Sequence, residues 1–348
     1  MTVTLVRTAA PDDADRRRPV PAILALLLAG AAVLVLAAAL SVAFGTRVVG
    51  WNDLVSAFTT DADGIAEAAV RQRIPRTLLA MLVGASLGVA GAVLQGLTRN
   101  PLADPMILGV TPGASLAVVS GIAFFGLSTA TGYIWVAITG AALASAFVYG
   151  IGSLGRGGPT PLKLALSGAA TTAAFTSLIS AILLPRVDVL NSFRFWQVGG
   201  VGGATYTKLG QVLPFLIVGA LICIACSRGL NSLALGDELA TGLGERVMVI
   251  RVAAFVGAVT LCGAATAVAG PIAFVGLVVP HVCRLLIGVD HRWLLPSAAM
   301  VGALLLTVAD VVGRVVARPS EIEVGIVTAI IGAPFFIYVV RKQKVRAL

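Results

Sequence analysis

Long apolar blocks without charged residues constrain this chain more than any other feature. Eight of them can be read from the sequence: Val20–Arg47 (which ends at its Arg), Thr77–Thr98, Pro105–Gly155, Leu164–Pro185, Leu209–Ser227, Val252–Cys283, Trp293–Ala309 and Val324–Val340. A helix needs about 20 apolar residues to cross a bilayer. Only 12% of the residues are charged, against roughly 25% in soluble domains. The chain is therefore expected to lie in a membrane.

Two of these blocks are long enough for two helices each. Pro105–Gly155 has a break near 128–132, and Val252–Cys283 has one at Gly270-Pro271 if its ends include the flanking arginines. The fold class predicted is an all-α integral membrane protein with about ten transmembrane helices. The expected organisation is an N-terminal tail, one ten-span domain and a C-terminal tail, at 1–19, 20–341 and 342–348.

The distribution of Lys and Arg predicts the orientation. With both termini in the cytosol, 16 of the 25 basic residues fall on the inside, as the positive-inside rule favours. The longer outside segments are then 45–75, 185–207 and 311–323, and the inside segments are 98–106, 154–163, 228–247 and 284–293. The net charge of +9 fits this topology and contact with membrane lipid, and no nucleic-acid partner is expected. Ten spans divide into two halves of five, which would be inverted relative to each other.

One inside segment, "NSLALGDELATGLG" (Asn231–Gly244), does not look like a membrane span. It carries two adjacent acids, Asp237 and Glu238, between glycines, and it predicts two short helices in water. Within the spans, Gly84, Gly88 and Gly91 share about one helix face and favour close helix packing.

Several kinds of chemistry have no sequence signal. There is no phosphate-binding G-x-x-x-x-G-K-[ST] motif and no nucleophile set typical of an enzyme. Cys223-x-x-Cys226 and the two histidines lack partners at ligand spacing, so we expect no metal site and no cofactor bound by this chain. Asp310 is the main charged residue expected within a span, which disfavours an ion-coupled carrier. An energy source outside the chain is expected.

Four segments resemble the FecCD/BtuC-like permeases of bacterial ATP-driven (ABC) importers for ferric siderophores, haem and cobalamin. They are "RIPRTLLAMLVGASLGVAGAVLQGLTRNPLADPMILGVTPGAS", "NSLALGDELATGLGERV", "AVAGPIAFVGLVVPHVCRLLIGVDHRWLLP" and "EIEVGIVTAIIGAPFFIYVVRK". The resemblance implies a multi-pass subunit of the bacterial plasma membrane that is not itself an enzyme. Its partners would be a second permease copy, identical or related, two cytosolic ATPase subunits that use ATP and Mg²⁺, and an external substrate-binding protein.

The resemblance also implies roles for particular residues. The cytosolic double helix would dock into the ATPase through Leu235, Gly236, Asp237, Glu238, Ala240, Leu243 and Gly244. The binding protein would dock on Arg73, Arg76 and Arg314, whose planar guanidinium groups suit carboxylates. The pathway and its inner gate would include Asn100, Leu102, Thr160, Pro161, Ser167 and Thr171.

Each of these assignments has a simpler structural alternative. The arginines can anchor the ends of spans in the interface, and the hydroxyls can serve helix packing. Glu323 stands where the family usually has proline, with Glu321 beside it. The function expected is that of an importer permease for ferric siderophores; a haem or cobalamin importer, and an ion-coupled secondary transporter, are the alternatives.

Overall fold

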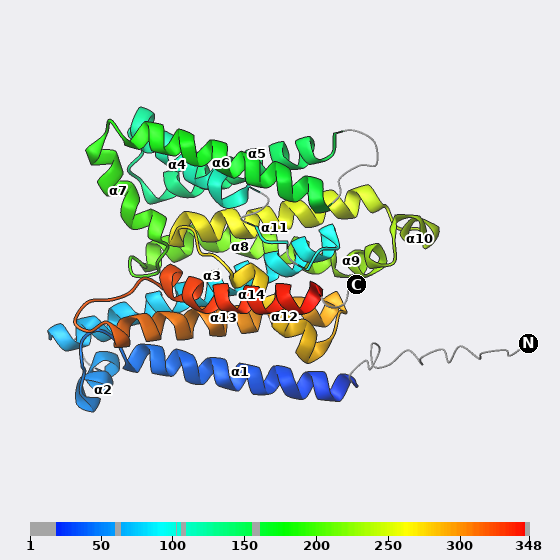
Figure 1. Ribbon diagram of the computed structural model, residues 1–348. Coiled ribbons are helices and arrows are strands. Elements are labelled where there is room, and N and C mark those ends of the chain that lie inside the picture. Colours follow the sequence, from blue (N-terminus) through cyan, green and yellow to red (C-terminus); the bar gives the residue numbers. More distant parts are fainter. Residues whose placement is uncertain (1–18, 60–63, 102, 106–108, 155–160, 345–348) are drawn as a thin grey trace, which may run out of the picture.

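The computed structural model describes residues 19–59, 64–101, 103–105, 109–154 and 161–344. Within these ranges the chain forms helices and no strands (Figure 1). The helices are α1 Val20–Ala43, α2 Trp51–Thr59, α3 Ile65–Thr98, α4 Val110–Phe125, α5 Ala130–Gly152, α6 Pro161–Leu183, α7 Val187–Val198, α8 Tyr206–Ala225, α9 Ser227–Ala234, α10 Asp237–Gly242, α11 Val247–Ala269, α12 Val275–Ile287, α13 His291–Val316 and α14 Val324–Lys344.

Ten of the described helices are the predicted spans. Seven are long and apolar enough to cross a membrane: α1, α3, α5, α6, α8, α11 and α13. Three shorter apolar helices, α4, α12 and most of α14, fill the remaining positions. The expected breaks are present, because α4 ends at Phe125 before α5 begins, and α11 ends at Ala269 before Gly270.

Helices extend into all three segments that the sequence had suggested as longer outside loops. Segment 45–75 contains α2 and the first turns of α3, and segment 185–207 contains α7. Helix α13 continues past Ala309 to Val316 and so enters segment 311–323. The spans were delimited by the absence of charge, whereas these helices carry arginines and acids, of which Arg76, Asp310 and Arg314 pair with each other.

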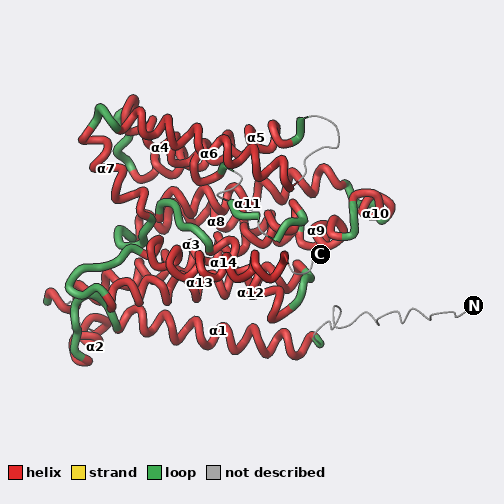
Figure 2. The backbone as a smooth tube through the Cα atoms, in the orientation of Figure 1, coloured by secondary structure: helices red, strands yellow, loops and turns green. Residues whose placement is uncertain are grey.

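The spans run along the length of a bundle with two distinct ends (Figure 1). One end carries α2 and α7, and the other carries α9 and α10. The start of α1 and the end of α14 lie at the α9–α10 end, as an even number of crossings requires. Figure 2 shows loops at the two ends and further loop segments inside the bundle.

Helix α3 lies in the middle of the bundle and packs very closely on α12 and α13. A Cβ atom on Gly84 would lie 2.2 Å from the carbonyl oxygen of Gly302, and one on Gly91 would lie 1.9 Å from that of Gly276. Gly88 approaches α13 in the same way. The predicted glycine face therefore permits contact between helix backbones, and larger side chains there would force the helices apart.

Candidate functional sites at the two ends of the bundle

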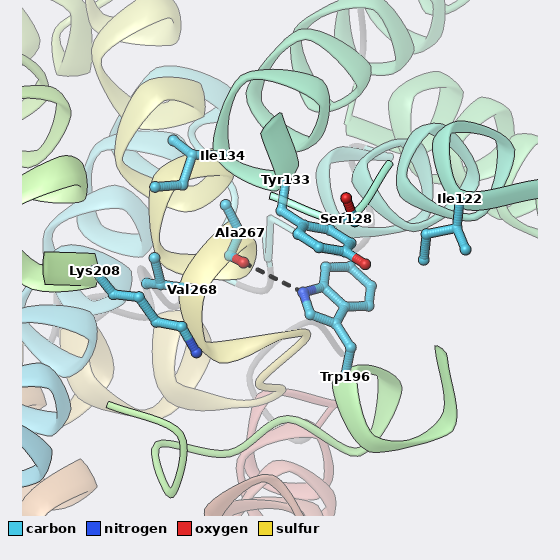
Figure 3. A pocket seen from close by; sticks show the side chains of 8 residues that line it. All are labelled: Ile122, Ser128, Tyr133, Ile134, Trp196, Lys208, Ala267 and Val268. Carbon is cyan, nitrogen blue, oxygen red and sulfur yellow. Dashed lines mark hydrogen bonds between the residues drawn. The ribbon is translucent and has the colours of Figure 1, made fainter. Parts of the chain in front are cut away.

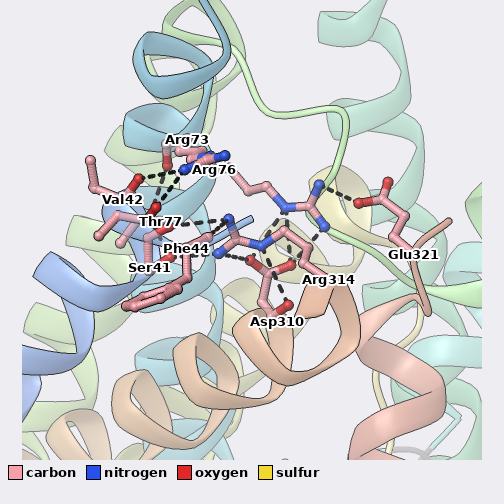
Figure 4. A network of polar contacts seen from close by, with 10 residues as sticks. Ser41, Val42, Phe44, Arg73, Arg76, Thr77, Asp310, Arg314 and Glu321 are labelled. Carbon is pink, nitrogen blue, oxygen red and sulfur yellow. Dashed lines mark hydrogen bonds and ion pairs between the residues drawn. The ribbon is translucent and has the colours of Figure 1, made fainter. Parts of the chain in front are cut away.

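A cluster of charged side chains joins α3, α13 and the start of α14 at the α2–α7 end (Figure 4). Asp310 is 1% exposed and accepts hydrogen bonds from Arg76, at 2.8 Å, and it forms an ion pair with Arg314 at 2.9 Å. Arg76 also contacts Glu321 at 2.8 Å. Buried charges are tolerated at such a site when they are paired and hydrogen-bonded, as these are.

Arg314 and a neighbouring arginine of α3, Arg73, hold the end of α1. Arg314 donates to the carbonyl oxygens of Ser41 and Phe44 at 3.1 and 3.0 Å, and to the Ser41 hydroxyl at 2.7 Å. Arg73 donates to Val42, Ala43 and Arg47 carbonyls. The last carbonyls of a helix have no partner within it and carry partial negative charge, so the two guanidinium groups satisfy them.

The structure thus brings Arg73, Arg76 and Arg314 together at one end, as expected for docking residues, but it does not expose them. Arg73 is 6% and Arg314 is 2% exposed, and the side chain of Arg76 is 11% exposed. Their donors bind groups of the same chain. The docking role stays a prediction, while a structural role in joining α1, α3 and α13 follows from the contacts.

Glu323 lies beside this cluster, directly before α14. One of its carboxylate oxygens is buried without a hydrogen-bond partner among the described residues, close to Gly200. Burial raises the pKa of Glu323, and the neighbouring charge of Glu321 raises this pKa further. This acid therefore adds a carboxyl group that is poorly solvated.

At the opposite end, α9 and α10 form a small double helix, here called the knob and defined as Ser227–Gly244 (Figure 1). Gly236 and Gly244 have φ angles of 114° and 84°, which favour glycine and permit the sharp turns before and after α10. Three leucines at a spacing of four, Leu235, Leu239 and Leu243, are 59%, 62% and 65% exposed. Leu235 ends α9, whereas Leu239 and Leu243 lie one turn apart at the end of α10, so both short helices expose leucine.

The knob departs from expectation at two positions. Ala240 was expected to contact the ATPase, but it is fully buried and supports the knob from within. Leu239 was not expected, yet it is exposed between Leu235 and Leu243. The i, i+4 spacing of Leu239 and Leu243 indicates one face of a helix, whereas Leu235 precedes the turn at Gly236 and belongs to the end of α9.

Polar contacts attach the knob to the spans. Asp237 forms ion pairs with Arg99 at the end of α3 and with Arg251 of α11, the latter at 2.9 Å. The Asn231 amide donates to Asp290 at 2.7 Å, and its oxygen accepts from the backbone N–H of His291 at 2.9 Å. Hydrogen bonds from Arg292 lower the pKa of Asp290 to about 2, so this acid stays ionised at neutral pH.

The predicted pathway residues fall into three groups. Asn100 lies at the end of α3, where its N–H donates to Gln95. Ser167 and Thr171 are buried. The Ser167 hydroxyl donates to the Val148 carbonyl of α5, and the Thr171 hydroxyl donates to the Ser167 carbonyl. These contacts serve helix packing, and the exposed hydroxyls of α6 are those of Thr176, Ser177 and Ser180. Leu102, Thr160 and the side chain of Pro161 lie outside the described residues.

A pocket of about 270 Å³ opens between α4, α5, α7, α8 and α11 at the α2–α7 end (Figure 3). Its wall consists of Ile122, Ser128, Tyr133, Ile134, Trp196, Lys208, Ala267 and Val268. The Trp196 indole donates to the Ala267 carbonyl at 3.3 Å, and Lys208 donates to Gly203 at 2.7 Å. This pocket was not predicted from the sequence, because the residues that line it come from separate segments of the chain.

Known proteins resemble this chain along most of its length. It is 40% identical over 341 residues to the iron(3+)-hydroxamate import system permease protein FhuB of Bacillus subtilis, covering 97% of this chain and 88% of that protein. It is 44% identical to the ferric enterobactin transport system permease protein FepD of Escherichia coli, covering 89% and 93% of the two chains.

The fold has a counterpart among solved structures. A transporter of the metal-chelate ABC type, in an inward-facing conformation, superposes with a TM-score of 0.79 at 30% identity and covers 92% of this chain and 99% of that one. The model of the FecCD transport family matches residues 21–342, which include every described span apart from the first residue of α1 and the last two of α14. The chain belongs to the FecCD transport family.

Proposed function

We propose that this chain is the permease subunit of an ATP-driven importer that carries ferric-siderophore complexes across a bacterial plasma membrane. The observation that carries the proposal is the exposure of Leu235, Leu239 and Leu243 on the knob. The knob lies beyond the ends of the spans, and exposed apolar side chains on so short a segment typically mark a protein interface. A cytosolic ATPase is the partner that a permease of this family requires.

The rest of the assembly follows from the same proposal. Two ATPase subunits bind two knobs, so a second permease copy faces the first across a central pathway. The exposed face of α6 suits the wall of that pathway, because it combines leucines with the small hydroxyl residues Thr176, Ser177 and Ser180. A binding protein delivers cargo at the α2–α7 end, which is then the outer face, and both termini lie in the cytosol.

The cargo proposed is an intact ferric chelate. Relatives of the chain are named as permeases for iron(3+)-hydroxamate, ferric enterobactin and Fe(3+)-citrate. The exposed polar groups of α6 are hydroxyls, which bind a bulky polar surface weakly and are poor ligands for a bare metal ion in their neutral form. Weak contacts along the wall let a large complex pass without being held.

The test is uptake by the reconstituted permease, ATPase and binding protein in proteoliposomes. A panel of ⁵⁵Fe-labelled chelates, free ferric iron, haem and cobalamin is supplied outside. ATP-dependent accumulation of a ferric hydroxamate, catecholate or citrate complex supports the proposal. Preferential accumulation of haem, cobalamin or free iron would contradict the cargo, and accumulation driven by an ion gradient without ATP would contradict the transporter class.

A further inference from the structure

The two short helices of the knob are attached to the spans in different ways. Helix α9 is fixed to the start of α13 by the part-buried hydrogen bonds of Asn231 with Asp290 and His291. Helix α10 follows Gly236, whose positive φ marks a turn with little side-chain hindrance. Its attachments among the described residues are the buried Ala240 and the ion pairs of Asp237.

One of the two ion-pair partners of Asp237 stands at the end of α3. Arg99 is the residue at which α3 ends, in the left-handed region with φ of 49°, and its N–H bonds back to Gly96. The last turns of α3 are held in turn by Gln95, which donates to the Gly276 carbonyl of α12 at 3.1 Å and accepts from Arg284. A displacement of Arg99 is therefore a displacement of the end of α3.

Helix α3 reaches from this end of the molecule to the other. Its 34 residues span about 51 Å at 1.5 Å per residue. Near its first turns it presents Arg76 to Asp310 and Glu321, and between the two ends Gly84 and Gly91 hold it against α13 and α12. A helix packed this closely moves with its neighbours as one body, because close-packed interiors transmit strain.

We propose that Asp237 is a positioning residue that attaches α10 to α3, so that movement of the knob by the ATPase reaches the outer ion cluster through α3. This inference rests on the proposed function. It changes the role expected for Asp237, whose carboxylate then binds Arg99 and Arg251 of its own chain instead of a group on the ATPase.

The test is a double-mutant cycle with Asp237→Asn, Arg99→Gln and both together, measured in proteoliposomes as chelate uptake per ATP hydrolysed. Each single change should lower this ratio about two- to fivefold, the range that an exposed ion pair supports. The double variant should resemble Asp237→Asn, because Asp237→Asn already removes the contact that Arg99→Gln removes. Glu245→Gln is the matched control: it removes a charge from the same surface, but Glu245 bonds to Ser232 of the knob.

A second measurement does not depend on transport. Amide hydrogen exchange in α10 of the isolated permease should become faster in Asp237→Asn and in Arg99→Gln, and stay unchanged in Glu245→Gln. Unchanged exchange in both variants would overturn the attachment, even if the wild type transports nothing and the proposed function fails. Additive losses of coupling, or loss of ATPase binding in Asp237→Asn with none in Arg99→Gln, would place Asp237 in the ATPase interface instead.

Discussion

Replacing Arg314 with methionine tests whether the arginines at the α2–α7 end stabilise the fold or bind a partner protein. The change removes the guanidinium donors of Arg314 while keeping much of the apolar stem. The Ser41 and Phe44 carbonyls of α1 then lose their partner, and Asp310 keeps only Arg76. Breaking a buried ion pair costs about 3–5 kcal/mol when the remaining charge has no other partner. Because Arg76 remains, the lower end, about 3 kcal/mol, is expected.

The expected change in melting temperature follows from the size of the chain. An unfolding entropy of ~2.1 cal/mol/K per residue over 348 residues gives ~0.7 kcal/mol/K, so about 3 kcal/mol lowers Tm by roughly 4 °C. The assay is thermal unfolding of the purified protein in detergent. Glu321→Gln is the control, because its exposed ion pair contributes at most about 1 kcal/mol. An unchanged Tm in Arg314→Met, together with lost capture of the binding protein, would refute this reasoning and make Arg314 a docking residue.

Four further outcomes are expected. Replacing 236–244 with a flexible Gly/Ser run should leave membrane abundance unchanged and abolish uptake, since a flexible linker transmits no displacement. Leu239→Ser should weaken ATPase binding roughly tenfold in a pull-down titration, because burying one leucine contributes about 1.5–3 kcal/mol. Gly88→Leu should lower Tm or yield, because its Cβ would lie 2.3 Å from a backbone oxygen of α13, whereas Gly210→Leu, with open space at its Cβ, should not. Glu323→Gln should raise Tm near neutral pH. Burial raises the pKa of Glu323 in the folded state, so the wild type loses stability as the pH rises past the ordinary carboxyl pKa. The difference in Tm between variant and wild type should therefore shrink as the pH falls toward the ordinary carboxyl pKa.

The spans were predictable because a bilayer imposes one strong rule on the sequence. Blocks of about 20 apolar residues without charge give the ten apolar helices, and the glycine at 270 and the polar residues near 130 mark the breaks. The helical character of Asn231–Gly244 was predictable from its glycines and acids. These features depend on residues close together in the sequence.

The charged contacts were not predictable, because they join residues far apart in the chain. Arg76 meets Asp310 and Arg99 meets Asp237 across 234 and 138 positions. An arginine at the end of a span has the same local sequence whether it faces water, a partner protein or the carbonyls of another helix. The burial of Arg73 and Arg314 results from the contact of α1 with α3 and α13, and the sequence around each arginine does not indicate it.

Charge is used differently at the two ends, and the difference fits the movement proposed. At the α2–α7 end Asp310 and Arg314 are almost fully buried, and separating them would leave Arg314 without its buried carboxylate partner. At the knob, Asp237 is 44% and Arg99 is 39% exposed, so water can replace either partner. An exposed pair contributes about 0–1 kcal/mol and can break and reform at little cost. A contact that must adjust during each transport cycle is therefore better placed at the knob, and a contact that must hold three helices together is better placed in the buried cluster of Asp310.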